Sequence, residues 1–192
     1  TFGFIGLGLI GGSIAKGIKR ACPDARIMAY MRTRAKLEQA QADGIVDVIL
    51  DGIGEPLREC DIIFLCTPVE YNAQYLTQIR PFLRPGALIS DVGSTKEDIH
   101  RVVTSLGMED VFVGGHPMAG SEKTGYENAT DHLLENAYIE ETEYFSGYDI
   151  NGKSYSFGRG KYVLGINGKL YFETRIKQAF LCYYPHITST LA

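Results

Sequence analysis

The chain has 192 residues, of which 45% are hydrophobic and 22% charged, a balance typical of a globular protein with a buried core. Its formal net charge of -4 argues against nucleic acid as a partner, because phosphate recognition usually requires a basic surface. No apolar run approaches the roughly 20 residues that span a bilayer, and the first residues lack a signal-peptide pattern. We therefore expect a cytoplasmic protein with no membrane partner.

The cysteines do not form a recognisable redox or metal motif. They stand at Cys22, Cys60, Cys66 and Cys182, without a C-x-x-C pair and without histidine at metal-ligand spacing. This pattern favours reduced cysteines that serve as small apolar residues in a cytosolic protein. No metal site is predicted.

Residues 1 to about 138 alternate between strand and helix patterns. Strand-like apolar runs occupy residues 2–6, 26–31, 46–50, 61–67, 87–92 and 111–114. Helical patterns occupy residues 10–21, 33–42, 70–83 and 95–106; for the second, Thr33 is the expected N-cap and Gly44 the stop. This alternation predicts an α/β fold of the Rossmann type, a doubly wound and mainly parallel sheet with helices on both faces. Ligands of such sheets bind at the carboxyl ends of the strands.

The pattern changes after Tyr138. From Ser146 onward the chain is rich in Gly, Tyr and Lys, and two similar segments, 150–155 and 166–171, each contain Asn-Gly between β-formers. Asn-Gly in this setting is the strongest short hairpin signal. We therefore predict a Rossmann domain over residues 1–145 and an appendage over 146–192, with two hairpins within 148–174 and a helix over 175–184.

The first strand is followed by a glycine-rich loop. The sequence Gly6-Leu7-Gly8-Leu9-Ile10-Gly11 fits G-x-G-x-x-G and lies between a strand and a helix, as a dinucleotide-binding loop requires. In such a loop the first glycine makes the turn, the second lets the backbone approach the pyrophosphate, and the third allows close packing of helix and strand. The helix N-terminus then faces the phosphates. The alternative, a glycine-rich turn without a ligand, does not account for the strand and helix units that follow.

The end of the second strand leaves the cofactor open between NAD and NADP. NAD-specific sites usually carry Asp or Glu there to bind the ribose hydroxyls, and this sequence has Met31, Arg32, Thr33 and Arg34 instead. Arg32 and Arg34 would suit a 2′-phosphate. Alternatively, both are solvated residues at the start of a helix.

Three further segments follow predicted strands and would lie along the same edge of the sheet. They are Cys66-Thr67-Pro68-Val69, Asp91-Val92-Gly93-Ser94-Thr95-Lys96 and the run from Gly114 to Glu122, G-G-H-P-M-A-G-S-E. Together with the glycine-rich loop, the last two resemble the prephenate dehydrogenase family, and the resemblance covers residues 1–138. The residues after Tyr138 do not resemble the helical domain that follows in that family.

The resemblance implies oxidative decarboxylation of prephenate to 4-hydroxyphenylpyruvate, a step of tyrosine biosynthesis, with hydride transfer to NAD, or to NADP. It implies that His116 is the catalytic base toward the substrate hydroxyl and that Ser94 binds the same hydroxyl or orients His116. Glu122 would be a gate or a supporting group, and Thr67 and Pro68 would shape the nicotinamide pocket. The resemblance also implies a homodimer, built in that family by the helical domain. Arogenate dehydrogenase activity, or a dinucleotide-binding module with little activity because that domain is missing, are the alternatives.

Several of these residues have a second interpretation. Ser94 also fits the N-cap of the following helix, with Glu97 completing a capping box. Lys96 and Lys123 either attract the substrate carboxylates or are ordinary surface lysines. His100, His132 and His186 have no comparable setting, so we expect them to be structural or surface residues.

Overall fold

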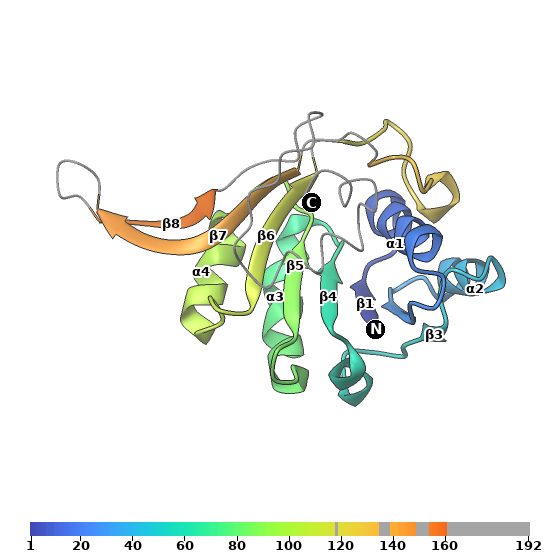
Figure 1. The fold of residues 1–192 in the computed structure, drawn as a ribbon, viewed down its shortest axis with the longest axis horizontal. Coiled ribbons are helices and arrows are strands. Elements are labelled where there is room, and N and C mark those ends of the chain that lie inside the picture. The colour runs from blue at the N-terminus through green and yellow to red at the C-terminus, as the bar shows by residue number, and fades with distance from the viewer. Residues whose placement is uncertain (118, 135–138, 149–153, 161–192) are drawn as a thin grey trace, which may run out of the picture.

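A computed structural model describes residues 1–117, 119–134, 139–148 and 154–160. The described residues form an eight-stranded sheet in the order β3-β2-β1-β4-β5-β6-β7-β8 (Figure 1). The six strands β1 to β6 are parallel to one another. Strand β7 pairs antiparallel with β6, and β8 pairs antiparallel with β7. The strands are β1 (Phe2–Ile5), β2 (Ile27–Tyr30), β3 (Val48–Ile49), β4 (Ile62–Leu65), β5 (Leu88–Asp91), β6 (Phe112–Pro117), β7 (Ile139–Tyr148) and β8 (Ser154–Gly160).

Helices cover both faces of this sheet. The α-helices are α1 (Leu9–Ala21), α2 (Arg34–Ala42), α3 (Val69–Ile79) and α4 (Glu97–Leu106). Short 3₁₀ turns occupy Glu55–Glu59, Arg80–Phe82 and Tyr126–Asn128. The predicted Rossmann-type, doubly wound and mainly parallel fold is thereby confirmed.

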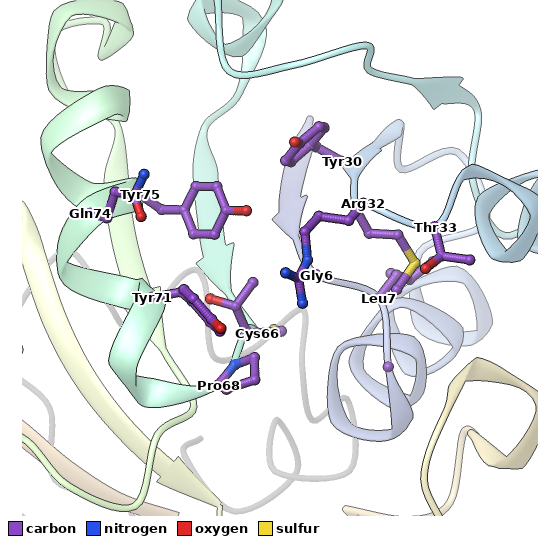
Figure 2. Close-up of a pocket in the computed structure, with 13 residues that line it drawn as sticks. Gly6, Leu7, Tyr30, Arg32, Thr33, Cys66, Pro68, Tyr71, Gln74 and Tyr75 are labelled. Atoms are coloured by element: carbon purple, nitrogen blue, oxygen red, sulfur yellow. The ribbon is translucent and has the colours of Figure 1, made fainter.

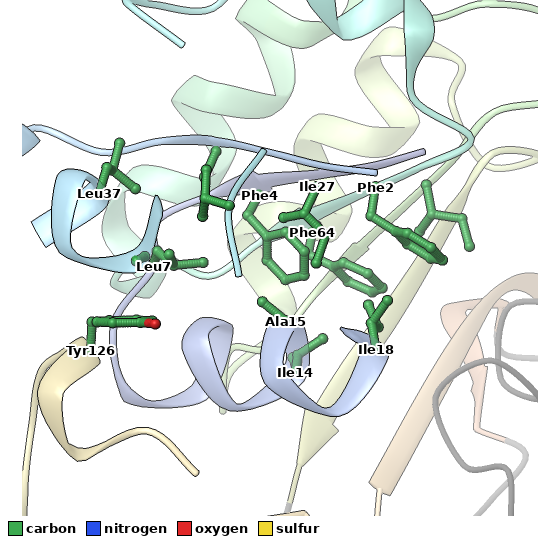
Figure 3. Close-up of a cluster of buried hydrophobic side chains, with 14 of the residues drawn as sticks. Phe2, Phe4, Leu7, Ile14, Ala15, Ile18, Ile27, Leu37, Phe64 and Tyr126 are labelled. Carbon is green, nitrogen blue, oxygen red and sulfur yellow. The ribbon is translucent and has the colours of Figure 1, made fainter. Parts of the chain in front are cut away.

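The alternation of side chains along the buried strands divides the core into two clusters. Phe2 and Phe4 of β1 and Phe64 of β4 face α1, where they pack with Ile14 and Ile18 (Figure 3). Their neighbours along the strands point to the opposite face, toward α3 and α4, in a second cluster that includes Ile5, Ile63, Leu65, Leu76, Ile99 and Val103. Strands that are buried on both faces read as continuous apolar runs, as these do.

The helix ends differ from the expected ones at three places. Helix α4 begins at Glu97 with Lys96 as its N-cap, so Ser94 is not the cap and the capping box with Glu97 is wrong. Helix α3 ends at Ile79 rather than near residue 83, and a 3₁₀ turn follows, because Pro81 has no N–H to continue the helix. Thr33 does precede α2, but its hydroxyl caps no backbone N–H. The stop at Gly44 is confirmed by its φ of 74°.

The sheet continues across the predicted boundary between residues 145 and 146. Strand β7 pairs with β6 and then with β8, with Tyr148 opposite Ser154. This antiparallel pairing on either side of residues 149–153 is the arrangement that a hairpin at Asn151-Gly152 requires. The turn itself, the second hairpin at Asn167-Gly168, the helix over 175–184, Cys182 and His186 lie outside the described residues. The division into domains stays a prediction.

Candidate functional site

The glycine-rich loop has the geometry of a phosphate-binding turn. Gly6 has a φ of 91°, and a Cβ there would lie 2.7 Å from the carbonyl oxygen of Cys66. A Cβ on Gly11 would lie 2.7 Å from the carbonyl oxygen of Gly6, so the first turn of α1 packs directly on the loop. A Cβ on Gly8 would meet nothing within 4 Å. The first and third glycines are therefore required by the packing of the chain, and the second leaves open space beside the helix N-terminus.

A cavity of about 380 Å³ lies beside this loop, between the carboxyl ends of β1, β2 and β4 (Figure 2). Of the predicted cofactor residues, Gly6, Leu7, Gly8, Arg32, Thr67 and Pro68 all line it. Leu9, Ile10 and Gly11 do not line this cavity, but they form the first turn of α1 directly after it. The strand order reverses between β1 and β4, and sheets of this kind bind their ligands at such a point.

Three tyrosines add an aromatic wall that the sequence analysis did not foresee. Tyr30 at the end of β2 meets Tyr75 of α3 edge to face, with ring centroids 6.1 Å apart. Tyr71, one turn earlier on α3, is 37% exposed and stands under the guanidinium of Arg32, whose Cζ is 5.3 Å from the ring centroid. The spacing of Tyr71 and Tyr75 predicts that they share one face of a helix. Only the fold shows that this face lies opposite the glycine-rich loop.

The two arginines after β2 are placed differently. Arg32 lines the cavity and faces Tyr71 (Figure 2). Arg34 pairs with Asp51 at 2.5 Å and with Glu38 at 3.2 Å, and it does not line the cavity. Only the first of the predicted pair is thus available to a ligand in this cavity.

A buried ion pair connects the loop after β5 with β6 at the carboxyl edge of the sheet. Lys96 Nζ donates to Asp91 Oδ2 at 2.7 Å, to the Gly93 carbonyl oxygen at 2.6 Å and to the Gly115 carbonyl oxygen at 2.6 Å. Asp91 also accepts hydrogen bonds from the Gly93 N–H and the Gly115 N–H. Burial raises the pKa of the Asp91 carboxyl, and Lys96 and these N–H groups oppose that effect.

This network decides between the two interpretations of Lys96. The side chain is only 14% exposed and its partner Asp91 is fully buried, so Lys96 is neither a surface lysine nor a group that points freely at a substrate. It connects the residue before Ser94 with the residue before His116. Asp91 belongs to a segment already placed at this edge of the sheet, but no role was predicted for it, although an acidic residue at the end of a buried strand is an unusual feature.

The predicted catalytic and substrate residues lie outside this cavity, on or after neighbouring strand ends. Ser94 is exposed in the loop between β5 and α4, and His116 is half-buried. His116 lies within β6, opposite Glu140 of β7, so the predicted end of this strand at residue 114, which left His116 in the following loop, was wrong. The reason is that β7 pairs with residues 113–117 and extends the strand. Glu122 and Lys123 are exposed in the segment that follows.

His100, His132 and Cys60 have structural or surface surroundings. His100 on α4 meets the ring of Phe112 edge-on, and burial together with the charge of Lys96 lowers its pKa to about 4. His132 is an exposed partner of Arg20 and Asp131. Burial raises the pKa of the Cys60 thiol to about 11, which keeps it protonated. Among the described residues, no group of three or more His, Cys, Asp or Glu is placed to hold a metal ion.

Comparison with known proteins identifies the family. The family model described as the nucleotide-binding domain of prephenate dehydrogenase matches residues 14–142, well over half of the chain. The chain belongs to the prephenate dehydrogenase family. It is 44% identical over 142 residues to the prephenate dehydrogenase of Lactococcus lactis subsp. cremoris, a match that covers 72% of this chain and 40% of that protein.

Two solved structures of this family have the same fold. The prephenate dehydrogenase of Aquifex aeolicus, in complex with hydroxyphenyl propionate and NAD+, matches with a TM-score of 0.68 and 29% identity, over 73% of this chain and 49% of that one. The arogenate dehydrogenase of Synechocystis matches with a TM-score of 0.67 and 33% identity, over 73% and 49% of the two chains. The chain thus spans about half the length of these family members, or less.

Within the part of the chain that the structure describes, no helix is long and apolar enough to cross a membrane.

Proposed function

We propose that this chain carries the nucleotide-binding half of a prephenate dehydrogenase, which oxidises and decarboxylates prephenate with NAD or NADP as the hydride acceptor. One observation carries the proposal: the cavity at the glycine-rich loop and the segment of His116 lie along one sheet edge in a chain of this family. The Lactococcus relative bears that name, and the Aquifex structure contains NAD+ with a hydroxyphenyl compound.

The residues around the cavity fit a dinucleotide. The open space at Gly8 lets phosphate oxygens reach the N-terminus of α1, where N–H groups have no partner within the helix. Thr67 and Pro68, at the end of β4, would flank the nicotinamide and exclude water from it. The Thr67 hydroxyl donates to Asn72 Oδ1 at 2.6 Å, which holds this corner in place. When bound, either dinucleotide supplies an acceptor for the hydride that leaves the ring carbinol of the substrate.

In this proposal His116 acts on the substrate hydroxyl. As hydride leaves the ring carbon, a neutral imidazole accepts a hydrogen bond and then the proton of that hydroxyl, and Ser94 holds the hydroxyl in place. The bond to the ring carboxylate breaks, CO2 departs, and its electron pair completes the aromatic ring. The proton returns to the phenol oxygen of 4-hydroxyphenylpyruvate, so no net proton is released by this exchange.

Glu122 and Lys123 follow His116 on an exposed segment, where they would meet the substrate rather than the cofactor. Lys123 would attract the carboxylates of prephenate, and Glu122 would act as a gate or support the hydrogen bonds around His116. In the family's pattern a helical domain completes the pocket, and a second copy of the chain joins through that domain.

Arogenate is the second candidate substrate, because the Synechocystis relative is an arogenate dehydrogenase. The two substrates differ in the side chain that stands opposite the ring hydroxyl, so His116 and Ser94 would serve both. Turnover of prephenate and of arogenate, each with NAD and with NADP, distinguishes the candidates. Cofactor binding without turnover of either substrate would instead favour the binding-module alternative.

The decisive variant is His116→Asn. Loss of a general base typically lowers the rate by about 10²–10⁴, while the affinity for NAD should change little because the phosphates bind at the other loop. His132→Asn, a change at an exposed surface histidine, is the control and should keep full activity. If His116→Asn turned prephenate over as fast as the unmodified chain, the assignment of the catalytic base would be wrong.

A further inference from the structure

The dinucleotide cavity has an unusual charge for a site that binds NAD. Among the described residues that line it, none is acidic, and Arg32 is the one that carries a charge. An NAD site usually places Asp or Glu at the end of the second strand, where its carboxylate binds the two ribose hydroxyls. Here β2 ends at Tyr30 and is followed by Met31, whose thioether is at best a weak acceptor.

The lack of a carboxylate has two consequences for the adenosine ribose. The ribose hydroxyls lose the acceptor that would favour them, and a phosphate on the 2′ oxygen meets no negative charge from the cavity wall. Both effects reduce the advantage of NAD over its 2′-phosphorylated form.

Arg32 lies in this cavity wall, where it can contact a phosphate on the 2′ oxygen. Its guanidinium lies over the ring of Tyr71, at 5.3 Å from the centroid, and it forms no ion pair with a carboxylate among the described residues (Figure 2). Contact with an aromatic face restrains an arginine without using its N–H groups. The donors therefore stay available for phosphate oxygens, with which a guanidinium forms a two-bond fork.

The neighbouring residues separate this arginine from the other charges. Arg34 forms ion pairs with Asp51 and Glu38, and none of these three residues lines the cavity. Thr33 lines the cavity beside Arg32, and its hydroxyl does not cap α2. A hydroxyl and a guanidinium thus stand next to each other at the end of β2.

We propose that Arg32, with Thr33 beside it, forms a subsite for the 2′-phosphate of NADP, so that the chain binds NADP more tightly than NAD. The inference rests on the dinucleotide site of the proposed function, and it concerns which dinucleotide that site prefers.

The test is a set of binding measurements on the full chain, without substrate. Calorimetric titration gives the Kd of NADP, NAD, 2′,5′-ADP and 5′-AMP for the unmodified chain and for Arg32→Ala and Arg34→Ala. We expect NADP to bind more tightly than NAD, and 2′,5′-ADP more tightly than 5′-AMP. Because a hydrogen bond to a charged group contributes about 1.5–3 kcal/mol, Arg32→Ala should weaken NADP by roughly 10- to 150-fold and change NAD by less than about threefold.

Arg34→Ala is the matched control, and it should leave the preference between the two dinucleotides unchanged. The Arg32 side chain is exposed, so its loss should not affect folding, and a thermal melt checks this. Tighter binding of NAD than of NADP by the unmodified chain would overturn the subsite, and so would an equal loss of both in Arg32→Ala; the dinucleotide site would stand in either case. Failure of both dinucleotides to bind would contradict that site itself, and the proposed function with it.

Discussion

Gly8 and Gly11 belong to one motif, but the structure gives them different physical tasks. At Gly11 an added Cβ would lie 2.7 Å from the Gly6 carbonyl oxygen and 2.9 Å from Cys66 Cβ, closer than packed atoms allow. At Gly8 the same atom would meet nothing, and the φ of -86° suits any L-residue. A substitution at Gly8 should therefore act on ligand binding, and one at Gly11 on the fold.

We predict that Gly8→Val keeps the stability of the chain and binds dinucleotide much more weakly, because the side chain occupies the space of the pyrophosphate. Gly11→Ala should instead lower the free energy of unfolding by about 1–3 kcal/mol, the usual cost of overpacking. Urea unfolding and calorimetric titration of the two variants measure both effects. Unchanged dinucleotide affinity in a folded Gly8→Val chain would contradict the site.

At the scale of the elements, the pair of Asp91 and Lys96 connects β5, the loop before α4, and β6. A single atom of Lys96, the Nζ, donates hydrogen bonds to the carbonyl oxygens of both Gly93 and Gly115. Removing one member of a buried pair leaves a charge without compensation, which typically costs about 3–5 kcal/mol.

Lys96→Met should therefore destabilise the chain by about 3–5 kcal/mol in urea unfolding. The double variant Asp91→Asn with Lys96→Met should recover part of this loss, because no buried charge remains. Arg101→Met on the same helix is the control: its ion pairs with Glu97 and Asp98 are exposed, so its loss should cost at most about 1 kcal/mol. Equal stability of Lys96→Met and Arg101→Met would show that the buried pair has no such role.

The packing of α4 against β6 should also depend on pH through His100. Its pKa in the folded chain, about 4, lies below the ordinary 6.5, so the folded state binds the proton less readily than the unfolded state. By linkage, the stability contributed by neutral His100 is fully present above about pH 6.5 and is lost as the pH falls toward 4.

Thermal unfolding between pH 7 and pH 4 tests this prediction. We expect the unmodified chain to lose more stability over this range than His100→Gln, in which that titration is absent. His132→Gln, at an exposed ring, should follow the unmodified chain. Parallel pH profiles of His100→Gln and the unmodified chain would rule the effect out.

At the scale of the whole molecule, β7 closes the edge of the sheet that carries His116. It pairs with β6 from Val113 to Pro117, and thereby covers N–H and C=O groups that would otherwise be exposed. Uncovered edges of this kind pair with other chains.

A chain that ends at Leu134 should consequently melt at a lower temperature and aggregate more than the full chain, as measured by thermal denaturation and light scattering. A chain that ends at Gly160 keeps β7 and β8 and serves as the comparison. If both shortened chains behaved alike, β7 would have no protective role.

Several features of this protein follow from local sequence, because their cause is local. Apolar runs and helical patterns predicted the alternating elements from residue 2 to residue 114, and the strand, loop and helix around Gly6, Gly8 and Gly11 predicted the phosphate-binding turn. The end of α2 at Gly44 was likewise predicted from the glycine alone. The roles of Ser94 and His116, which family motifs indicated, stay predictions.

Other features depended on contacts between distant residues, and only the tertiary structure decided them. Lys96 was ambiguous until Asp91 and Gly115 surrounded it, and Arg32 and Arg34 were equivalent until Asp51 paired with one and Tyr71 with the other. His116 was assigned to a loop because its strand partner, β7, lies more than twenty residues away in the sequence. In each case the partner is brought near by the order of the strands, which local patterns do not encode.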